Sequence, residues 1–219
     1  MERKTVHVAV YDTFADWEFP YATTALSGAG YQIVYVGESG ETVISMGGMR
    51  VTPTLSIADL RPDDSALLIL PGADAWEKVL PPFASAARGF LDAGVPVAAI
   101  CGAVTGLARE GLLDDRPHTG AAAEVLAATG YRGGAHYREA DAVTDGDLIT
   151  AGPTEPVAFA REILARLDVY PPEVRDAWFR LFRHSDADAH RVLAAHESAG
   201  GGGGPVAEAH GAHPGGGAA

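Results

Sequence analysis

The stretch Val95-Pro96-Val97-Ala98-Ala99-Ile100-Cys101-Gly102-Ala103 decides the fold. Its first six residues form a short apolar run, which is typical of a strand buried on both faces of a sheet. Helical spacing follows directly over residues 103–110. Alanines two positions on either side of Cys101 leave room for a sharp strand-to-helix turn. The pattern therefore places Cys101 at a nucleophile elbow, beyond the carboxyl end of a sheet strand.

The remainder of the chain repeats this alternation of strand and helix. Apolar or β-branched runs predict strands at residues 6–11, 31–36 and 66–70. Residues 37–53 suit an irregular hairpin, and residues 142–150 suit a second hairpin that turns at 145–147. Helices are predicted over residues 17–29, 82–93, 121–128 and 156–167. We therefore expect an α/β protein with a mostly parallel sheet and helices on both faces.

The 219 residues, of which 47% are hydrophobic, can bury one substantial core. Residues 1–170 are predicted to form the α/β domain, and residues 171–197 a helical extension. The extension should pack on the domain or on a dimer partner, because its aromatic and leucine side chains are too apolar to remain in water together. Residues 198–219 consist almost entirely of Gly, Ala, Pro and His, which predicts a disordered tail.

A formal net charge of −13 without a Lys/Arg cluster argues against a nucleic-acid partner. No run reaches the roughly 18 apolar residues of a membrane span, so we expect a cytoplasmic protein. The histidines of the extension and tail do not share a helical face, and no metal site is predicted. Phosphate-binding and dinucleotide-binding glycine motifs are missing, so no cofactor is expected.

Cys101 is the only cysteine, which excludes an internal disulfide. A lone cysteine is either an inert small hydrophobe or a reactive thiol. At the predicted elbow, the following helix would direct its free N–H groups and its dipole at the sulfur, and this should lower the pKa of the thiol. We therefore expect Cys101 to be reactive.

Two further segments end at the same edge of the predicted sheet. Gly72 and Ala73 follow the strand at 66–70 and, with Gly102, could donate N–H groups to an oxyanion, although Pro71-Gly72 also suits an ordinary turn. Glu18 follows the first strand between two aromatic residues, where burial would keep its carboxyl protonated and able to move a proton. The alternative is that Glu18 stabilises a helix N-terminus.

Three motifs in order, D-W-E-F at 16–19, L-P-G at 70–72 and A-I-C-G-A at 99–103, resemble the ThiJ/PfpI superfamily. The similarity extends over residues 6–167 and includes I-T-A-G-P-T at 149–154. It implies a flavodoxin-like three-layer α/β sandwich, commonly dimeric, of the class I glutamine amidotransferase-like type. It also implies that Cys101 is the nucleophile and that Glu18 is hydrogen-bonded to it.

The resemblance leaves a histidine partner open. Many members have a histidine directly after the cysteine, but Gly102 stands there in this chain. Other members supply one from the loop after the elbow helix, where His118 is the candidate and His136 the fallback. Each histidine is alternatively a surface-loop residue. The absence of a Cys-His pair at the usual position argues against a peptidase, and no Cys-His-Glu triad supports glutamine hydrolysis.

These residues favour a cysteine-dependent enzyme that acts on small electrophilic carbonyl or amide substrates. The resemblance suggests glyoxalase, deglycase or amidase-type chemistry, with Cys101, Glu18 and His118 as catalytic residues and Gly72, Ala73 and Gly102 at the oxyanion. One alternative is a non-catalytic sensor of oxidative stress in which Cys101 is oxidised. Another is a chaperone or binding module that uses the aromatic extension.

Overall fold

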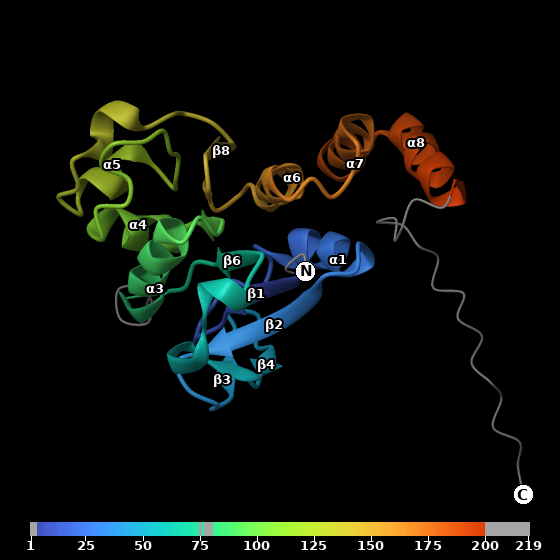
Figure 1. Ribbon diagram of the computed structural model, residues 1–219. Helices are drawn as coiled ribbons and strands as arrows, with labels where there is room; N and C mark the ends of the chain where they lie inside the picture. Colours follow the sequence, from blue (N-terminus) through green and yellow to red (C-terminus); the bar gives the residue numbers. More distant parts are fainter. Residues whose placement is uncertain (1–3, 75, 77–80, 200–219) are drawn as a thin grey trace, which may run out of the picture.

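The computed structural model describes residues 4–74, 76 and 81–199. Most of the predicted disordered tail, residues 200–219, lies outside the described residues. Within the described ranges, nineteen segments of regular structure combine strands with helices, as expected for an α/β protein (Figure 1).

A seven-stranded sheet forms the centre of the molecule, in the order β5-β2-β1-β6-β7-β9-β8. Every neighbouring pair is parallel except β8 and β9, which form the predicted antiparallel hairpin. All residues of β6, β7 and β9 are buried, as helices on both faces of the sheet require. The strands are β1 (Thr5–Ala9), β2 (Gln32–Gly37), β5 (Leu55–Ser56), β6 (Leu67–Leu70), β7 (Val97–Ile100), β8 (Ala142–Asp145) and β9 (Leu148–Ala151).

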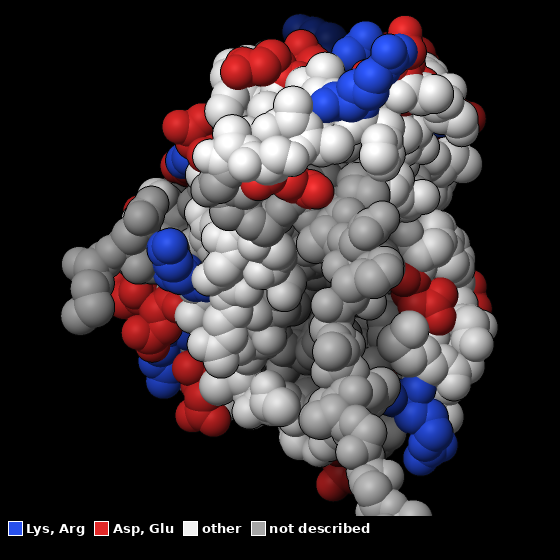
Figure 2. All heavy atoms as spheres, turned by 90° about the vertical axis from the view of Figure 1, so that its right-hand side faces the viewer, with Lys and Arg blue, Asp and Glu red and all other residues white. Residues whose placement is uncertain are grey.

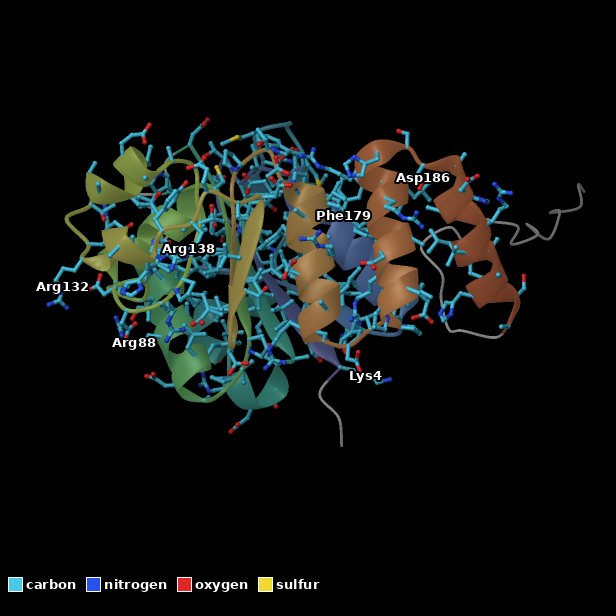
Figure 3. All side chains as sticks on the ribbon, turned by 90° about the horizontal axis from the view of Figure 1, so that it is seen from above. Lys4, Arg88, Arg132, Arg138, Phe179 and Asp186 are labelled. Atoms are coloured by element: carbon cyan, nitrogen blue, oxygen red, sulfur yellow. The ribbon has the colours of Figure 1, made fainter. Side chains whose placement is uncertain are left out.

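Helices cover the sheet on both faces. One layer contains α1 (Pro20–Gly28) and α6 (Pro156–Arg166), which pack against each other. The other contains α3 (Pro81–Asp92), α4 (Gly102–Arg109) and the short α5 (Ala123–Ala127). Viewed from above, the sheet lies between the two layers (Figure 3). The predicted three-layer α/β sandwich is confirmed.

The segment between β1 and α1 differs from its prediction. The helix expected from residue 17 begins only at Pro20, which occupies its first turn. Before it, the Thr13 N–H donates to Ile44 O at 2.7 Å, and the Ala15 N–H donates to Gly72 O at 2.9 Å. These long-range bonds hold the chain in turns. The predicted irregular hairpin beside this segment is present as β3 (Val43–Ile44) and β4 (Arg50–Val51).

The C-terminal extension consists of two helices, α7 (Pro172–His184) and α8 (Ala187–Ser198). Ser185 separates them in a left-handed conformation, with φ 54° and ψ 35°. Asp186 then begins α8, because its carboxylate accepts the Asp188 N–H at 2.9 Å (Figure 3).

The extension packs on the domain, which is one of the two arrangements expected from the sequence, the other being packing on a dimer partner. Trp178 on α7 is 1% exposed and lies edge-on to Tyr21 of α1, with ring centroids 6.3 Å apart. Its neighbour Phe179 faces α6, where the Arg161 guanidinium lies 4.3 Å from its ring centroid (Figure 3). Aromatic packing therefore joins α7 to the layer that contains α1 and α6.

The surface of the described residues carries scattered charges. On the face shown in Figure 2, Lys and Arg side chains are interspersed with Asp and Glu. No helix in the described part is long and apolar enough to cross a membrane. Among the described residues, no cluster of three or more His, Cys, Asp or Glu side chains could hold a metal ion.

We predict that Trp178→Ala lowers the free energy of unfolding by about 3–5 kcal/mol, because it leaves a large cavity between α7 and α1. Urea denaturation would measure the change. Phe182→Ala on the same helix is the control, since Phe182 is 37% exposed and should cost much less. Equal losses for the two variants would show that α7 does not depend on burial of Trp178.

Candidate active site

Cys101 connects two hydrogen-bond systems. Its N–H donates to Ala151 O at 3.1 Å and so extends the pairing of β7 with β9. Its carbonyl accepts the Val104 N–H at 3.1 Å, which opens α4. To belong to both, the residue adopts φ 60° and ψ −128°, a conformation that costs a non-glycine residue about 1–3 kcal/mol. The structure thus has the sharp strand-to-helix turn that the sequence predicted, and its backbone is strained at Cys101.

Glycines on both sides of the elbow leave room for it. A Cβ at Gly72 would lie 2.9 Å from both Cβ and Sγ of Cys101. A Cβ at Gly102 would lie 2.7 Å from Cδ1 of Trp76. Trp76 in turn has the Arg109 guanidinium 4.8 Å from its ring centroid. The elbow is therefore packed so tightly that neither glycine can carry a side chain without displacing a neighbour.

Glu18 lies beside the thiol and is fully buried. Its Oε2 accepts the Gly72 N–H at 2.6 Å. Its Oε1 is also buried and has no hydrogen-bond partner within the described part of the chain. Burial raises the pKa of Glu18 to about 7, and the hydrogen bonds from Gly72 and Cys101 oppose that rise. Near neutral pH this carboxyl can accept or release a proton.

The thiol differs from the sequence prediction in its acidity. Burial raises the pKa of Cys101 to about 12, and the charge of Glu18 and its hydrogen bond with the thiol act in the same direction. The Gly102 N–H at the start of α4 lowers this pKa, as expected, but does not compensate. The prediction of a lowered pKa is therefore wrong for the state in which Glu18 is ionised. Forming a thiolate depends on where the proton of this pair resides.

The predicted oxyanion donors divide into two groups. The Gly72 N–H is already bonded to Glu18 and is not free to bind substrate, which corrects its predicted role. The Gly102 N–H points at the sulfur, and the Ala73 N–H has no acceptor within the described residues. Ala73 and Gly102 remain as the candidate donors.

His118 lies in the loop after α4, as expected, but its partners are not in the thiol site. Its Nδ1 is 2.8 Å from Arg116 O, and its Nε2 is 3.1 Å from the Tyr131 hydroxyl. Its ring is buried, and burial lowers its pKa. No contact among the described residues joins His118 or His136 to Cys101. The geometry therefore gives no basis for His118 as a catalytic residue.

Sequence reasoning missed Tyr11. Its hydroxyl donates to Pro71 O, and its ring packs against Phe83 with centroids 5.4 Å apart. Burial raises its pKa well above the ordinary value, and the charges of Glu18 and Cys101 add to the rise. The available signal was its position, because Tyr11 follows β1 at the same carboxyl edge of the sheet as Cys101.

Glu18→Gln should remove a pH dependence of stability. The folded pKa of Glu18 is about 7 against an ordinary 4.5, so the folded state holds the proton more tightly and loses stability as pH rises between these values. The difference in unfolding free energy, variant minus wild type, should rise by about 3 kcal/mol from pH 4.5 to 7.5. Urea denaturation at each pH would measure it.

The exposed Glu41 provides the control for that measurement. Glu41→Gln should change the same difference far less, because solvent screens the charge. A difference for Glu18→Gln that stays constant between pH 4.5 and 7.5 would contradict the burial effect on Glu18.

Gly72→Ala is expected to destabilise the protein by about 1–3 kcal/mol and to slow alkylation of Cys101, because the added methyl displaces the sulfur. Gly89→Ala on α3 is the control, since a Cβ there meets no atom within 4 Å and should be neutral or slightly stabilising. Urea denaturation and mass spectrometry after iodoacetamide treatment would report both effects. Unchanged alkylation in Gly72→Ala would refute close packing at this contact.

Known proteins resemble this chain in sequence and in fold. The model of the DJ-1/PfpI family matches residues 4–166. A Bacillus subtilis protein named as the uncharacterized protease YoaZ is 33% identical over 192 residues, which cover 83% of this chain and 91% of that protein.

Two solved structures also match. The thiJ/pfpI family protein from Bacillus anthracis has a TM-score of 0.83 and 31% identity, covering 89% of this chain and 97% of that one. The DJ-1 superfamily protein Atu0886 from Agrobacterium tumefaciens has a TM-score of 0.73 and 36% identity, covering 88% of this chain and 99% of that one. On the family match over residues 4–166 and on these likenesses in sequence and fold, the chain belongs to the DJ-1/PfpI family.

Proposed function

We propose that this protein is a cysteine-dependent enzyme in which Cys101 adds to a small electrophilic carbonyl carbon, such as that of an α-oxoaldehyde. One observation carries the proposal: a fully buried Glu18 carboxyl lies beside a thiol held at a strained elbow. The pair supplies both a nucleophile and a group that can move a proton.

The chemistry balances within this pair. The thiol proton passes to the Glu18 carboxylate, and a sulfur electron pair forms the S–C bond. The π pair of the carbonyl moves to its oxygen, which takes the proton back from Glu18 to give a hemithioacetal. During this step the Ala73 and Gly102 N–H groups stabilise the negative oxygen. Because the pKa of Glu18 is about 7, both proton transfers involve a carboxyl suited to neutral pH.

Peptide hydrolysis is less well supported by the geometry, although YoaZ is named as a protease. A leaving amine must be protonated, which cysteine peptidases achieve with an imidazole next to the thiol. Residue 102 cannot supply one here, because any Cβ at that position would collide with Trp76. Both ring nitrogens of His118 have other partners.

Turnover of methylglyoxal by the full-length protein tests the proposal. Wild type should consume many equivalents, and Cys101→Ser should reduce the rate to the uncatalysed level because a hydroxyl is a far weaker nucleophile than a thiolate. Glu18→Gln should lower kcat by about 100-fold or more, since it removes the proton acceptor. The aldehyde remaining would be measured over time, with Tyr170→Phe as a control, since no contact among the described residues joins Tyr170 to the thiol.

Other outcomes would replace this proposal. Stoichiometric modification or oxidation of Cys101 without turnover would favour the stress-sensor alternative. Release of peptides from a denatured protein substrate, lost in Cys101→Ser, would favour a protease. Suppression of aggregation that survives Cys101→Ser would favour a chaperone.

A further inference from the structure

The peptide unit between Pro71 and Gly72 is held at both of its polar groups. The Tyr11 hydroxyl donates to Pro71 O, and the Gly72 N–H donates to Glu18 Oε2 at 2.6 Å. A peptide unit is planar, so any rotation moves its C=O and its N–H together. The bond from Tyr11 therefore fixes the direction in which the Gly72 N–H points.

This peptide also lies against the nucleophile. A Cβ added at Gly72 would lie 2.9 Å from Cys101 Sγ, and the Gly72 carbonyl accepts the Ala15 N–H at 2.9 Å. The C=O of Pro71 and the N–H and C=O of Gly72 are thus all bonded. These bonds fix the orientation of the peptide, and its N–H holds the Glu18 carboxyl beside the thiol.

Tyr11 acts through its hydrogen bond rather than through charge. A phenol has one proton to donate, and here Pro71 O takes it. Within the described residues, the titratable groups that face Glu18 are Tyr11, from the segment after β1, and Cys101. Because burial raises the pKa of Tyr11 well above 10, the phenol is neutral near pH 7. The donors left to the carboxyl are the Gly72 N–H and the thiol.

We propose that Tyr11 is a positioning residue, which clamps the Pro71–Gly72 peptide so that Glu18 stays bonded and faces the Cys101 thiol. The inference rests on the proposed use of Cys101 as a nucleophile. Its test measures the reactivity of the thiol and does not depend on turnover. The inference about Tyr11 can therefore fail while the proposed enzymatic function holds, and the proposed function can fail while the inference holds.

The experiment measures the rate of iodoacetamide alkylation of Cys101 from pH 4 to 11. A thiolate with a protonated Glu18 and a thiol with an ionised Glu18 hold the same number of protons, so their ratio does not change with pH. The logarithm of the wild-type rate should therefore flatten where Glu18 ionises, near pH 7.

In Tyr11→Phe this inflection should move upward by about half a pH unit or more, because a freely rotating peptide weakens a bond that favours the carboxylate. The ring of Phe keeps the contact with Phe83. In the Glu18→Gln background, Tyr11→Phe should shift no inflection, since no carboxyl remains to ionise. Circular dichroism would confirm that each variant is folded.

Tyr170→Phe is the matched control. Tyr170 is also buried and also donates to a backbone carbonyl, Ala25 O at 3.3 Å, but no contact among the described residues joins it to the thiol site. It should lose some stability and keep the wild-type inflection. The proposal is overturned if Tyr11→Phe destabilises the protein but keeps the wild-type profile, or if both variants shift the inflection equally.

Discussion

The N–H of Cys101 belongs to the sheet and its C=O to a helix, and the geometry of the site follows from satisfying both. Bonding to Ala151 O on one side and to the Val104 N–H on the other forces φ to 60°. The sulfur lies against Gly72, where only a hydrogen fits in place of a side chain. The N–H of the same Gly72 donates to the buried Glu18 carboxyl at 2.6 Å, so this one residue contacts both the thiol and the carboxyl.

Much of this architecture could be predicted from local sequence. Apolar runs located the central strands, and the small residues around Cys101 were enough to indicate the elbow. Glu18 and Gly72 were selected because each follows a parallel strand, and the carboxyl ends of such strands meet at one edge. These inferences depend on periodicity and topology, which a single chain displays directly.

What could not be predicted depends on partners distant in sequence. The segment before α1 is not helical, because its backbone N–H groups hydrogen-bond to the carbonyls of residues 44 and 72. The acidity of Cys101 depends on burial and on the carboxyl of Glu18, far earlier in the chain, whereas the local pattern displays only the helix N-terminus. The ring nitrogens of His118 likewise hydrogen-bond to Arg116 O and to the Tyr131 hydroxyl. The spacing of residues in the sequence does not predict these partners. Ser185 separates the extension into two helices although neither proline nor glycine marks the break.

The strained backbone of Cys101 also has a consequence for which residue evolution keeps at position 101. Glycine adopts positive φ without the clash that a Cβ brings, so at position 101 it would relax the turn. Selection for stability alone would thus favour loss of the sulfur, and a folded descendant without it would be the more robust protein. Cysteine at position 101 therefore stands against the conformational preference of its own backbone.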